Sequence, residues 1–412
     1  MIFYLAYIFF QAVSAVPTGR VDVVFPAVET SRSGMKTVKF RALNQDIELK
    51  LEPAGEILAK DFVFVNSKQP FDVEKLRRKI YRDIVNGAAL LIDENGPSSI
   101  KGIVNSNLRI EPHESGRQIG DGIRAHRIVE IRSDEDSYNN DIVTSMEIEK
   151  QADNLLSMGR QDKCLVLEIL SVTEYKLTRR FKADEALTEY ITTLFTGAEN
   201  LLKGLDSRIK IRLIGIDARK KGQDPSYIKQ SEYNDTYIYL VTILGNMKKY
   251  YCEKMNELEK SADLIMLILT REMIKVVDNK IVQRSVGKAA APMSANAKSC
   301  RILGRIGLQR RVDTVAHEVA HMLGVPHDGI GTEEVNLPNG PGAKDCPPST
   351  GFIMGNRNAA NQFKFSECSK KCAKYLLSLP RASCLFEDCK SFRLSNIENA
   401  QLAVISDYYA NV

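Results

Sequence analysis

The chain has 412 residues and a net charge of +5, with 44% hydrophobic and 26% charged side chains. It is longer than one ordinary domain, and its composition is that of a globular protein rather than a fibrous or low-complexity one. No run of about 18 apolar residues occurs, so no membrane span is expected.

Histidine, cysteine and charge are unevenly distributed along the chain. Three of the five histidines lie between residues 317 and 327, and the first of the eight cysteines is Cys164. Residues 16–163 hold 22 Lys and Arg against 24 Asp and Glu, a net of −2, which leaves +7 for the remainder. The chain therefore looks like two parts. The basic residues are dispersed without a nucleic-acid motif, which favours a solvated surface, although acidic substrates or the acidic part of the chain are alternatives.

The first fifteen residues carry no charged side chain. An apolar run at residues 2–10 is followed by the small residues VSA at 13–15, as in a secretory signal peptide. A buried first strand is the alternative. Secretion predicts an extracellular protein whose cysteines form disulfides. The sequon at residues 234–236 makes Asn234 a glycosylation candidate.

Residues 16–160 are predicted to be rich in strands. Short apolar or β-branched runs occur at 21–25, 47–51, 62–65, 90–92 and 128–131, with turn residues between them. The acidic segment 133–141 is typical of an exposed linker. His113 and His126 show no ligand spacing and are interpreted as ordinary hydrogen-bonded or surface residues.

From residue 165 the pattern changes to alternating strands and helices. Strands are predicted at 165–173, 209–216 and 262–269. Helices are predicted at 184–203, capped by Asp184, and at 237–258. This order indicates an α/β domain with a mixed sheet.

The segment 312–328 contains His317-Glu318-x-x-His321-x-x-Gly324-x-x-His327. Positions i and i+4 share one helix face, so His317 and His321 can bind one zinc ion. Gly324 permits a sharp turn that delivers His327 as a third ligand. Three nitrogen ligands leave a fourth position for water, which indicates a catalytic zinc site. No nearby Cys or His offers a fourth ligand for a closed structural site.

This motif is similar to that of the metzincin metallopeptidases, and Asp328 after the third histidine resembles the reprolysin (adamalysin, M12B) branch. Residues 351–355, GFIMG, resemble the methionine turn of the family, with Met354 as an apolar floor below the histidines. Astacins and serralysins place a Tyr where Asn356 stands here. The chain also resembles the short secreted members of the family in arthropod saliva and venom.

The resemblance implies an architecture and boundaries. We expect a signal peptide at 1–15, a strand-rich propeptide at 16–161 and a metzincin domain at 162–389. The domain would combine a mixed twisted sheet, flanking helices, an active-site helix and the methionine turn. Residues 390–412 are expected to be a tail without a disintegrin domain. Residues 165–175 resemble the first strand of the domain, and segments near 102, 109–112 and 126–129 resemble the propeptide.

The implied activity is that of a secreted zinc-dependent endopeptidase acting on internal peptide bonds of extracellular proteins. Glu318 would take a proton from the zinc-bound water and return it to the leaving amine. After residue 128 the only histidines are the three proposed ligands, so no histidine remains for a serine or cysteine triad. The edge strand that pairs with substrate would comprise Gly287, Lys288, Ala289 and Ala290.

Two other functions remain open. One is a secreted binding protein or toxin that acts by blocking a partner. The other is a zinc hydrolase of non-peptide substrates. The expected partners are protein or peptide substrates and the protein's own propeptide, without nucleic acid or a membrane span, and the expected state is a monomer.

The resemblance also implies disulfides Cys300–Cys384 and Cys346–Cys368. It leaves Cys164, Cys252, Cys372 and Cys389 unassigned, and Phe352 replaces a cysteine of the family. A structural Ca²⁺ at Glu168, Asp263 and Glu387 or Asp388 is weighed against ordinary surface charge.

Many relatives keep the zinc inactive with a propeptide cysteine, and residues 16–161 contain none. For Cys164, a disulfide is favoured over such a switch. Steric blocking by the propeptide, and cleavage near residues 155–165 by an unknown protease, are therefore the hypotheses for latency.

Overall fold

The structure is a computed structural model. It describes residues 18–131 except 66, 68–71 and 120–122, and residues 163–389 except 254, 279, 286, 290–301, 308–311, 336, 338 and 358. These two parts are called the N-terminal region and the C-terminal region below. The expected signal peptide, acidic linker and C-terminal tail lie outside the described residues, as do Cys300 and Ala290. Among the described residues, no helix is long and apolar enough to cross a membrane.

The N-terminal region is built on a sheet in which nine strands pair antiparallel in the order β1-β12-β9-β8-β7-β6-β4-β3-β2. Its elements are β1 (Thr18–Val24), β2 (Ala27–Thr30), β3 (Lys36–Ala42), β4 (Gln45–Pro53), the 3₁₀ turn η1 (Gly55–Ile57), α1 (Val73–Lys79), β6 (Ile80–Asp83), β7 (Ala88–Asp93), β8 (Ser99–Ile103), β9 (Leu108–Pro112) and β12 (His126–Ile131). A separate hairpin joins β10 (Gln118–Ile119) to β11 (Ile123–Arg124). The strand-rich character predicted for this region is confirmed.

Residues of β7 alternate between two apolar cores. Ala88, Leu90 and Ile92 pack in a core within the N-terminal region, whereas Ala89 and Leu91 pack in the core of the C-terminal region. Since successive side chains of a strand point to opposite faces, both faces of the sheet are covered at β7. This explains why the segment reads as a continuous apolar run rather than an alternating one.

The C-terminal region is built on a second sheet, whose path runs β19-β20-β16-β13-β14-β5, with β21 paired to β13. The strands are β13 (Lys163–Thr173), β14 (Ile209–Ala218), β16 (Leu264–Leu269), β19 (Gly287–Ala289), β20 (Ile302–Gly307), β21 (Phe386–Asp388) and β5 (Leu58–Val65). Neighbours from β20 to β5 are parallel, while β19 runs antiparallel to β20. β16 is buried along its whole length, as its unbroken apolar sequence predicts. The mixed α/β class is confirmed.

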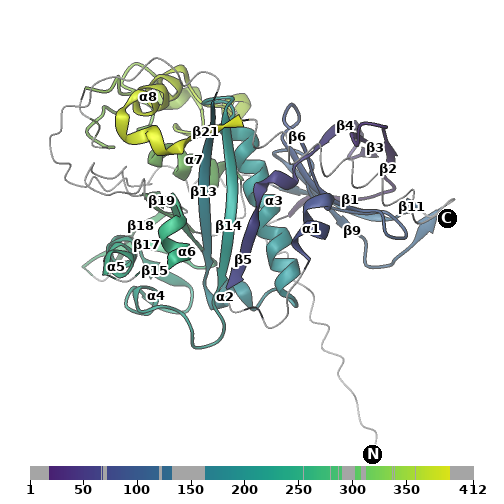
Figure 1. Ribbon diagram of the computed structural model, residues 1–412, viewed down its shortest axis with the longest axis horizontal. Helices are drawn as coiled ribbons and strands as arrows, with labels where there is room; N and C mark the ends of the chain where they lie inside the picture. Colours follow the sequence, from purple (N-terminus) through teal and green to yellow (C-terminus); the bar gives the residue numbers. More distant parts are fainter. Residues whose placement is uncertain are drawn as a thin grey trace, which may run out of the picture.

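One strand of this sheet comes from the N-terminal region. β5 pairs parallel with β14 and forms the end of the sheet opposite β19. Figure 1 shows β13, β14 and β5 side by side. The sequence predicts a strand at 62–65 but not this partner, because pairing between segments about 150 residues apart leaves no local pattern.

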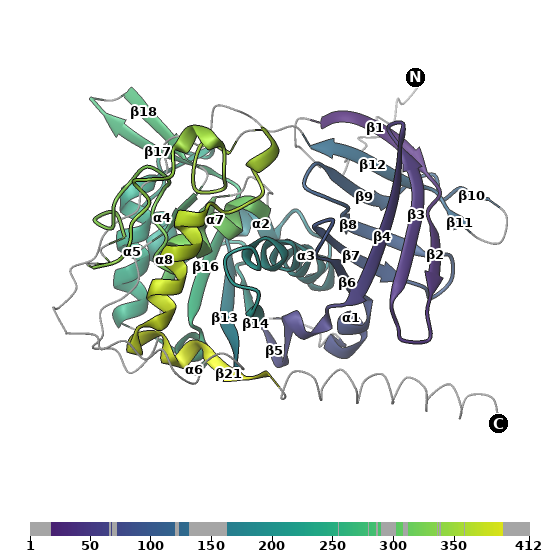
Figure 2. The same ribbon diagram turned by 90° about the horizontal axis from the view of Figure 1, so that it is seen from above.

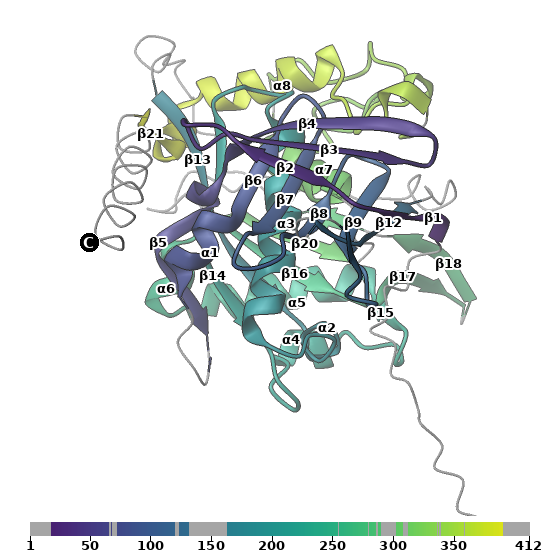
Figure 3. The same ribbon diagram turned by 90° about the vertical axis from the view of Figure 1, so that its right-hand side faces the viewer.

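The remaining elements surround the C-terminal sheet. The helices are α2 (Tyr175–Thr178), α3 (Asp184–Leu202), α4 (Ser226–Lys229), α5 (Leu240–Glu253), α6 (Glu257–Ser261), α7 (Val312–Met322) and α8 (Glu367–Ser378), with 3₁₀ turns η2 (Pro348–Thr350), η3 (Ala359–Asn361) and η4 (Pro380–Leu385). A small sheet orders β15 (Tyr237–Tyr239), β17 (Glu272–Val277) and β18 (Lys280–Ser285). α3 lies between the two large sheets (Figure 2). Viewed from the N-terminal region, β3 and β4 lie in front of the C-terminal sheet (Figure 3).

Two details of the predicted helices are wrong. The helix predicted at 237–258 is divided, because its first residues form β15 and Asn256 starts α6 with a capping box to Glu259. The cap of α3 is Ala183, one residue before the predicted Asp184. The Asp184 side chain instead accepts a hydrogen bond from Ser67 of the N-terminal region, at 3.0 Å.

Candidate metal centre

The helix α7 carries the first part of the histidine motif. All eleven of its residues, Val312 to Met322, are buried. His317 and His321 stand four residues apart on one face, and their Nε2 atoms lie 3.0 Å apart. A buried helix fixes both rings, so the pair is rigidly placed beneath the sheet.

The end of α7 is a Schellman turn centred on Gly324. The amide of Gly324 donates to His321 O and the amide of Val325 donates to Ala320 O, both at 3.0 Å. Gly324 has φ +79°, and a Cβ there would lie 3.0 Å from Leu337 Cδ2. Glycine is therefore required both by backbone conformation and by space.

This turn directs the chain back toward the helix and brings the third histidine to the first two. Ligand atoms of His317, His321 and His327 lie within 4.8 Å of one another. Among the described residues this is the one cluster of three or more His, Cys, Asp or Glu side chains with that geometry. The structure thus assembles all three histidines that the motif singles out.

Each histidine is oriented by a hydrogen bond on its Nδ1 side. His317 Nδ1 donates to Ile353 O at 2.9 Å, and His321 Nδ1 donates to Val325 O at 2.8 Å. His327 Nδ1 bonds to Glu334 Oε1 at 2.6 Å. A carbonyl oxygen can only accept, so the Nδ1 atoms of His317 and His321 carry their hydrogens. Such contacts fix the tautomer and orientation of metal ligands.

The donor set fits a zinc ion. Burial lowers the pKa of His317 and His321 well below the usual value, with the neighbouring Arg357 and His327 adding to the effect, so both rings are neutral. With hydrogen on Nδ1, their Nε2 atoms bring lone pairs together at 3.0 Å. Without a bound ion these two lone pairs would repel each other, and a cation between them removes that repulsion. Neutral imidazole is a preferred zinc ligand.

Glu318 lies on α7 directly after His317 and is fully buried. It is the acidic residue of the motif, and it belongs to the same buried helix as two of the histidines. The position combines a carboxylate with a low-dielectric setting, which strengthens its electrostatic interactions.

The turn at residues 351–355 lies against the histidines. Ile353 supplies the carbonyl that orients His317, and Met354 is fully buried, with its carbonyl accepting from the amide of Asp328 at 2.9 Å. The Asp328 side chain accepts from Ser366, the N-cap of α8, at 2.6 Å, and burial raises its pKa. These contacts connect the third histidine, the methionine turn and α8.

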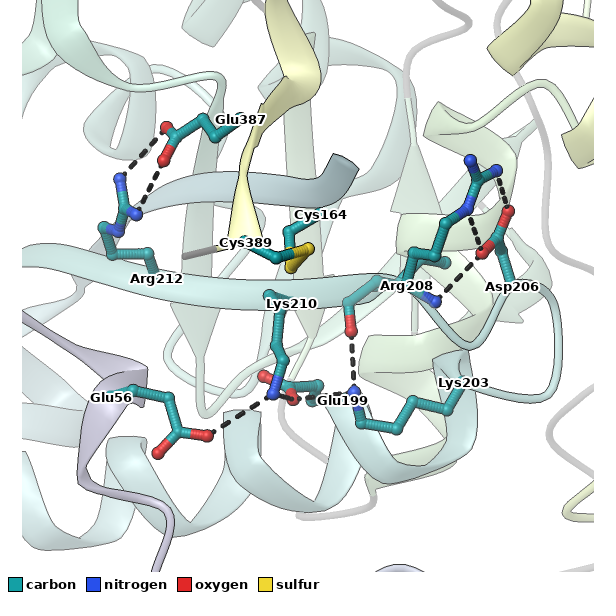
Figure 4. Close-up of a disulfide and its surroundings, with 11 residues drawn as sticks. Glu56, Cys164, Glu199, Lys203, Asp206, Arg208, Lys210, Arg212, Glu387 and Cys389 are labelled. Carbon is teal, nitrogen blue, oxygen red and sulfur yellow. Dashed lines mark hydrogen bonds and ion pairs between the residues drawn. A yellow bond between two sulfur atoms is a disulfide. The ribbon is translucent and has the colours of Figure 1, made fainter. Parts of the chain in front are cut away.

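Disulfides stabilise the surrounding loops. Cys346 is joined to Cys368, and Cys164 is joined to Cys389, so both ends of the C-terminal region are linked (Figure 4). Cys384 is also disulfide-bonded, while its expected partner Cys300 lies outside the described residues. Cys372 is buried as a free thiol that donates to Gly342 O, and burial raises its pKa to about 11. The sequence left the pairing of Cys164 open.

The expected substrate strand forms β19, the terminal strand on its side of the sheet. It pairs only through β20 in the described path, with Gly287, Lys288 and Ala289 opposite Ile306, Arg305 and Gly304. Asn234, the glycosylation candidate, is exposed in a turn where its side chain accepts from the amides of Thr236 and Tyr237.

Two of the carboxylates considered for calcium, Glu168 and Glu387, pair with an arginine. Arg212 donates to Glu168 at 2.9 Å and to both carboxylate oxygens of Glu387 at 3.1 and 2.8 Å. Figure 4 shows its bidentate pairing with Glu387. The Asp263 side chain accepts from the amide of Glu168 at 2.9 Å. Arg212 therefore bonds to two of these carboxylates at once through charge-assisted hydrogen bonds.

Two residues of the site were not found from the sequence. Glu334 holds His327 from a loop seven residues later, and acidic residues in loops are too common to stand out. Arg357 is buried and its Nε donates to Ile353 O at 2.9 Å, beside the carbonyl used by His317. Its φ of +47° is unusual for a residue with a side chain. Local sequence carries no sign of either role.

Comparison with known proteins identifies relatives that are metallopeptidases. The family described as Metallo-peptidase family M12B Reprolysin-like matches residues 281–378. Venom metalloproteinase antarease TserMP_A of Tityus serrulatus is 49% identical over 402 residues, covering 95% of this chain and 100% of that protein. Antarease-like TtrivMP_A of Tityus trivittatus is 48% identical over 403 residues, covering 95% and 100%. BumaMPs1 of Olivierus martensii is 33% identical over 412 residues, covering 96% and 100%.

The α/β fold and the three-histidine site define a zinc metalloprotease. The chain belongs to the reprolysin-like metallopeptidases of family M12B, and it is a metalloendopeptidase. Among solved structures, a chain titled "Structure of a chaperone-substrate complex" aligns with 52% of this chain and 36% of that chain at TM-score 0.24 and 15% identity, a likeness that carries no argument.

Proposed function

We propose that the C-terminal region hydrolyses internal peptide bonds of extracellular proteins, with Glu318 as the general base and His317, His321 and His327 as the zinc ligands. The observation that carries this proposal is the convergence of three imidazoles, each oriented by a bond to Nδ1. Zinc bound there supplies a Lewis acid that polarises the scissile carbonyl and makes water more acidic.

In this mechanism the protein's residues position water and move its proton. Glu318 takes the proton of the attacking water and later gives it to the leaving amine. Glu318 follows His317 directly on the buried helix α7, which holds the two residues in a fixed relative position. The Ile353 carbonyl keeps His317 in the required tautomer, and Met354 packs as an apolar support in the same turn.

Substrate binds as an added strand. The terminal position of β19 supports pairing of an extended peptide with Gly287, Lys288 and Ala289 through backbone hydrogen bonds. Ala290, which we expect to take part in this pairing, lies outside the described residues. Backbone hydrogen bonds do not distinguish between substrate side chains, so the choice of cleavage site comes from pockets near the methionine turn.

The processing of the chain is part of the proposal. Residues 1–15 direct secretion, 16–161 are a propeptide, 162–389 are the enzyme and 390–412 are a tail. Two of the relatives named above are venom metalloproteinases of Tityus species, which supports an extracellular enzyme. Asn234 is exposed and carries a glycan if the chain passes through the secretory pathway.

For the cluster at Glu168, Asp263 and Glu387, we propose that the Arg212 guanidinium serves in place of calcium. No observation favours a non-catalytic blocking protein or a hydrolase of non-peptide substrates.

Chelation and reconstitution test the proposal. The processed protein should cleave an unfolded protein such as casein, lose this activity in 1,10-phenanthroline and regain it with one equivalent of zinc. Cleavage that persists without metal would sink the proposal. A blocking protein would keep its biological effect when Glu318 is replaced, whereas a protease would lose it.

A further inference from the structure

The N-terminal region shares an apolar core with the C-terminal region. Ten of its residues are buried in the same cluster as the strands and helices of the enzyme: Ala54, Ile57, Leu58, Ala59, Phe62, Leu76, Ile80, Ala89, Leu91 and Ile103. Its second core lies wholly within the N-terminal region, so the region packs both on itself and on its neighbour. Separation would expose apolar surface on both sides, which disfavours release.

The pairing of β5 with β14 is close enough to depend on a glycine. Residues 63–65 lie opposite residues 215–217 in parallel register. A Cβ at Gly215 would lie 2.8 Å from Val63 O, whereas its contacts within the C-terminal region would be at 3.3 Å or more. Gly215 is therefore fitted to β5 more tightly than to its own region.

A buried ion network crosses the same boundary. Arg82 donates to Glu199 of α3 at 2.5 Å, to Glu56 at 3.1 Å and to Glu52 at 2.8 Å. The two atoms of the Arg82–Glu199 pair belong to side chains that are 6% and 1% exposed. Burial alone would lower the pKa of Arg82, but the carboxylates of Glu199 and Glu56 raise it above its ordinary value. Breaking a buried pair by losing one partner is costly.

Glu199 also has partners of its own region. Lys203 lies 3.1 Å from its carboxylate and Lys210 lies 3.9 Å away, and the amide of Ile211 donates to it at 2.8 Å. Burial alone would raise the pKa of Glu199, but Arg82, Lys203 and Lys210 hold it low. Figure 4 shows Lys203 and Lys210 with Glu199, and Glu56 of the N-terminal region bonded to Lys210. The Glu199 carboxylate is thus bonded by groups of both regions, with Arg82 as its partner from the N-terminal region.

Contacts across the boundary continue along α3. Lys101 pairs with Glu189, and Asn200 Nδ2 donates to Ala88 O at 2.9 Å. The pairs Lys101–Glu189 and Arg82–Glu199 join basic side chains of the N-terminal region to acidic ones of α3, opposite in sense to the net charges of the two sequence halves. The pair Glu56–Lys210 has the other sense. Docking therefore depends on specific pairs and not on the overall charge difference.

We propose that the N-terminal region stays bound to the C-terminal region as a separate chain after the connection between residues 131 and 163 is cut, with β5 retained beside β14. This inference rests on the proposed function in one respect, namely that the chain is cleaved between residues 131 and 163. The mature enzyme is then a complex of two chains. β5 and β19 end opposite sides of the sheet, roughly 24 Å apart at five strand spacings.

The experiment places a recognition sequence for a site-specific protease between residues 140 and 150 of the full chain and cuts the folded protein. Native size-exclusion chromatography at low micromolar concentration, followed by a denaturing gel, should show both fragments in one peak. Two separate peaks would overturn the proposal. Co-elution of the fragments does not depend on peptidase activity. Failure of this inference can therefore be distinguished from failure of the proposed function.

Matched variants test the contacts. Gly215→Ala should weaken the complex by about tenfold or more through the clash with Val63. Arg82→Gln should weaken it by about a hundredfold. The controls are Gly245→Ala, where a Cβ meets nothing within 4 Å, and Arg41→Gln, whose surface side chain is 66% exposed. Equal affinities for variants and controls would refute the assignment.

Hydrogen exchange on the cut wild-type protein covers the case in which a variant fails to fold. Amides of residues 215–217 should exchange slowly as long as β5 is in place. Rapid exchange there, with β13 still protected, would show that β5 has left and would overturn the proposal.

Discussion

Glu334 binds His327 at two points, with Oε1 on Nδ1 and Oε2 on the backbone amide, each at 2.6 Å. The side chain and main chain of the third histidine are therefore fixed by a single carboxylate. His317 and His321 are each held instead by a main-chain carbonyl. The third ligand lies outside the helix, and Glu334 supplies the rigidity that α7 gives to the other two.

Replacing Glu334 by Gln should weaken zinc binding by about 10–100-fold, because the ligand loses its charged partner while the volume is kept. A titration with metal-buffered zinc measures the change. The control is Glu333→Gln, since Glu333 is the exposed neighbour paired with Lys344. Equal zinc affinities in the two variants would contradict the role given to Glu334.

Gly324→Ala should lower the free energy of unfolding by about 1–3 kcal/mol, because alanine is strained at φ +79° and its Cβ would crowd Leu337 and Leu376. Urea unfolding measures it. Gly222→Ala has a similar φ of +81° with nothing within 4 Å. The difference between the two variants isolates crowding from backbone strain, and a smaller loss at Gly324 would contradict the account.

The sequence predicted the metal centre because most of its geometry is local. Helical spacing places His317 and His321, and one glycine turn places His327, so eleven residues of sequence contain the arrangement. The methionine turn was found by resemblance. Glu334 and Arg357 were missed because their roles depend on how loops fold back on the helix, which no periodicity records.

The sequence predicts those strands and helices whose hydrophobic pattern lies within a single segment. The strands at 165–173 and 262–269 and the helix at 184–203 are close to β13, β16 and α3. The partner of β5, the bond between Cys164 and Cys389 and the position of Arg212 among carboxylates all join residues far apart in the chain. These depend on tertiary packing, which sequence patterns do not show.

Asp263 should make stability fall as pH rises. Burial, with the carboxylates of Glu168 and Glu387, raises its pKa from 3.8 to about 7. Between these values the folded state keeps a proton that the unfolded state has lost, so folding is favoured at the acidic end and this advantage is lost toward pH 7. Asp263→Asn cannot ionise and should be more stable than wild type at pH 8, by about 2–4 kcal/mol, with little difference near pH 4. Thermal unfolding across this range checks it.

A second aspartate gives the opposite sign. Hydrogen bonds from Arg208 outweigh burial and lower the pKa of Asp206. Asp206→Asn should therefore lose stability at pH 8. If both variants shifted in the same direction, the linkage assigned to Asp263 would be wrong.

Calcium should not stabilise the wild-type protein, since the Arg212 guanidinium already bonds to both Glu168 and Glu387. Differential scanning calorimetry with and without Ca²⁺ should show the same melting temperature. Arg212→Gln should be less stable and should gain stability from Ca²⁺, whereas Arg208→Gln, paired with Asp206, should not respond. A calcium-dependent rise in the wild type would show that the ion binds despite the guanidinium.

The most direct test is the rate of peptide-bond cleavage by Glu318→Gln at a measured zinc content. The account predicts one zinc per chain in both proteins, and a rate in the variant that is lower by about 10²–10⁴-fold, because the ligands remain while the proton acceptor is lost. Cleavage at the wild-type rate by the zinc-loaded variant would contradict the central claim that Glu318 moves the proton.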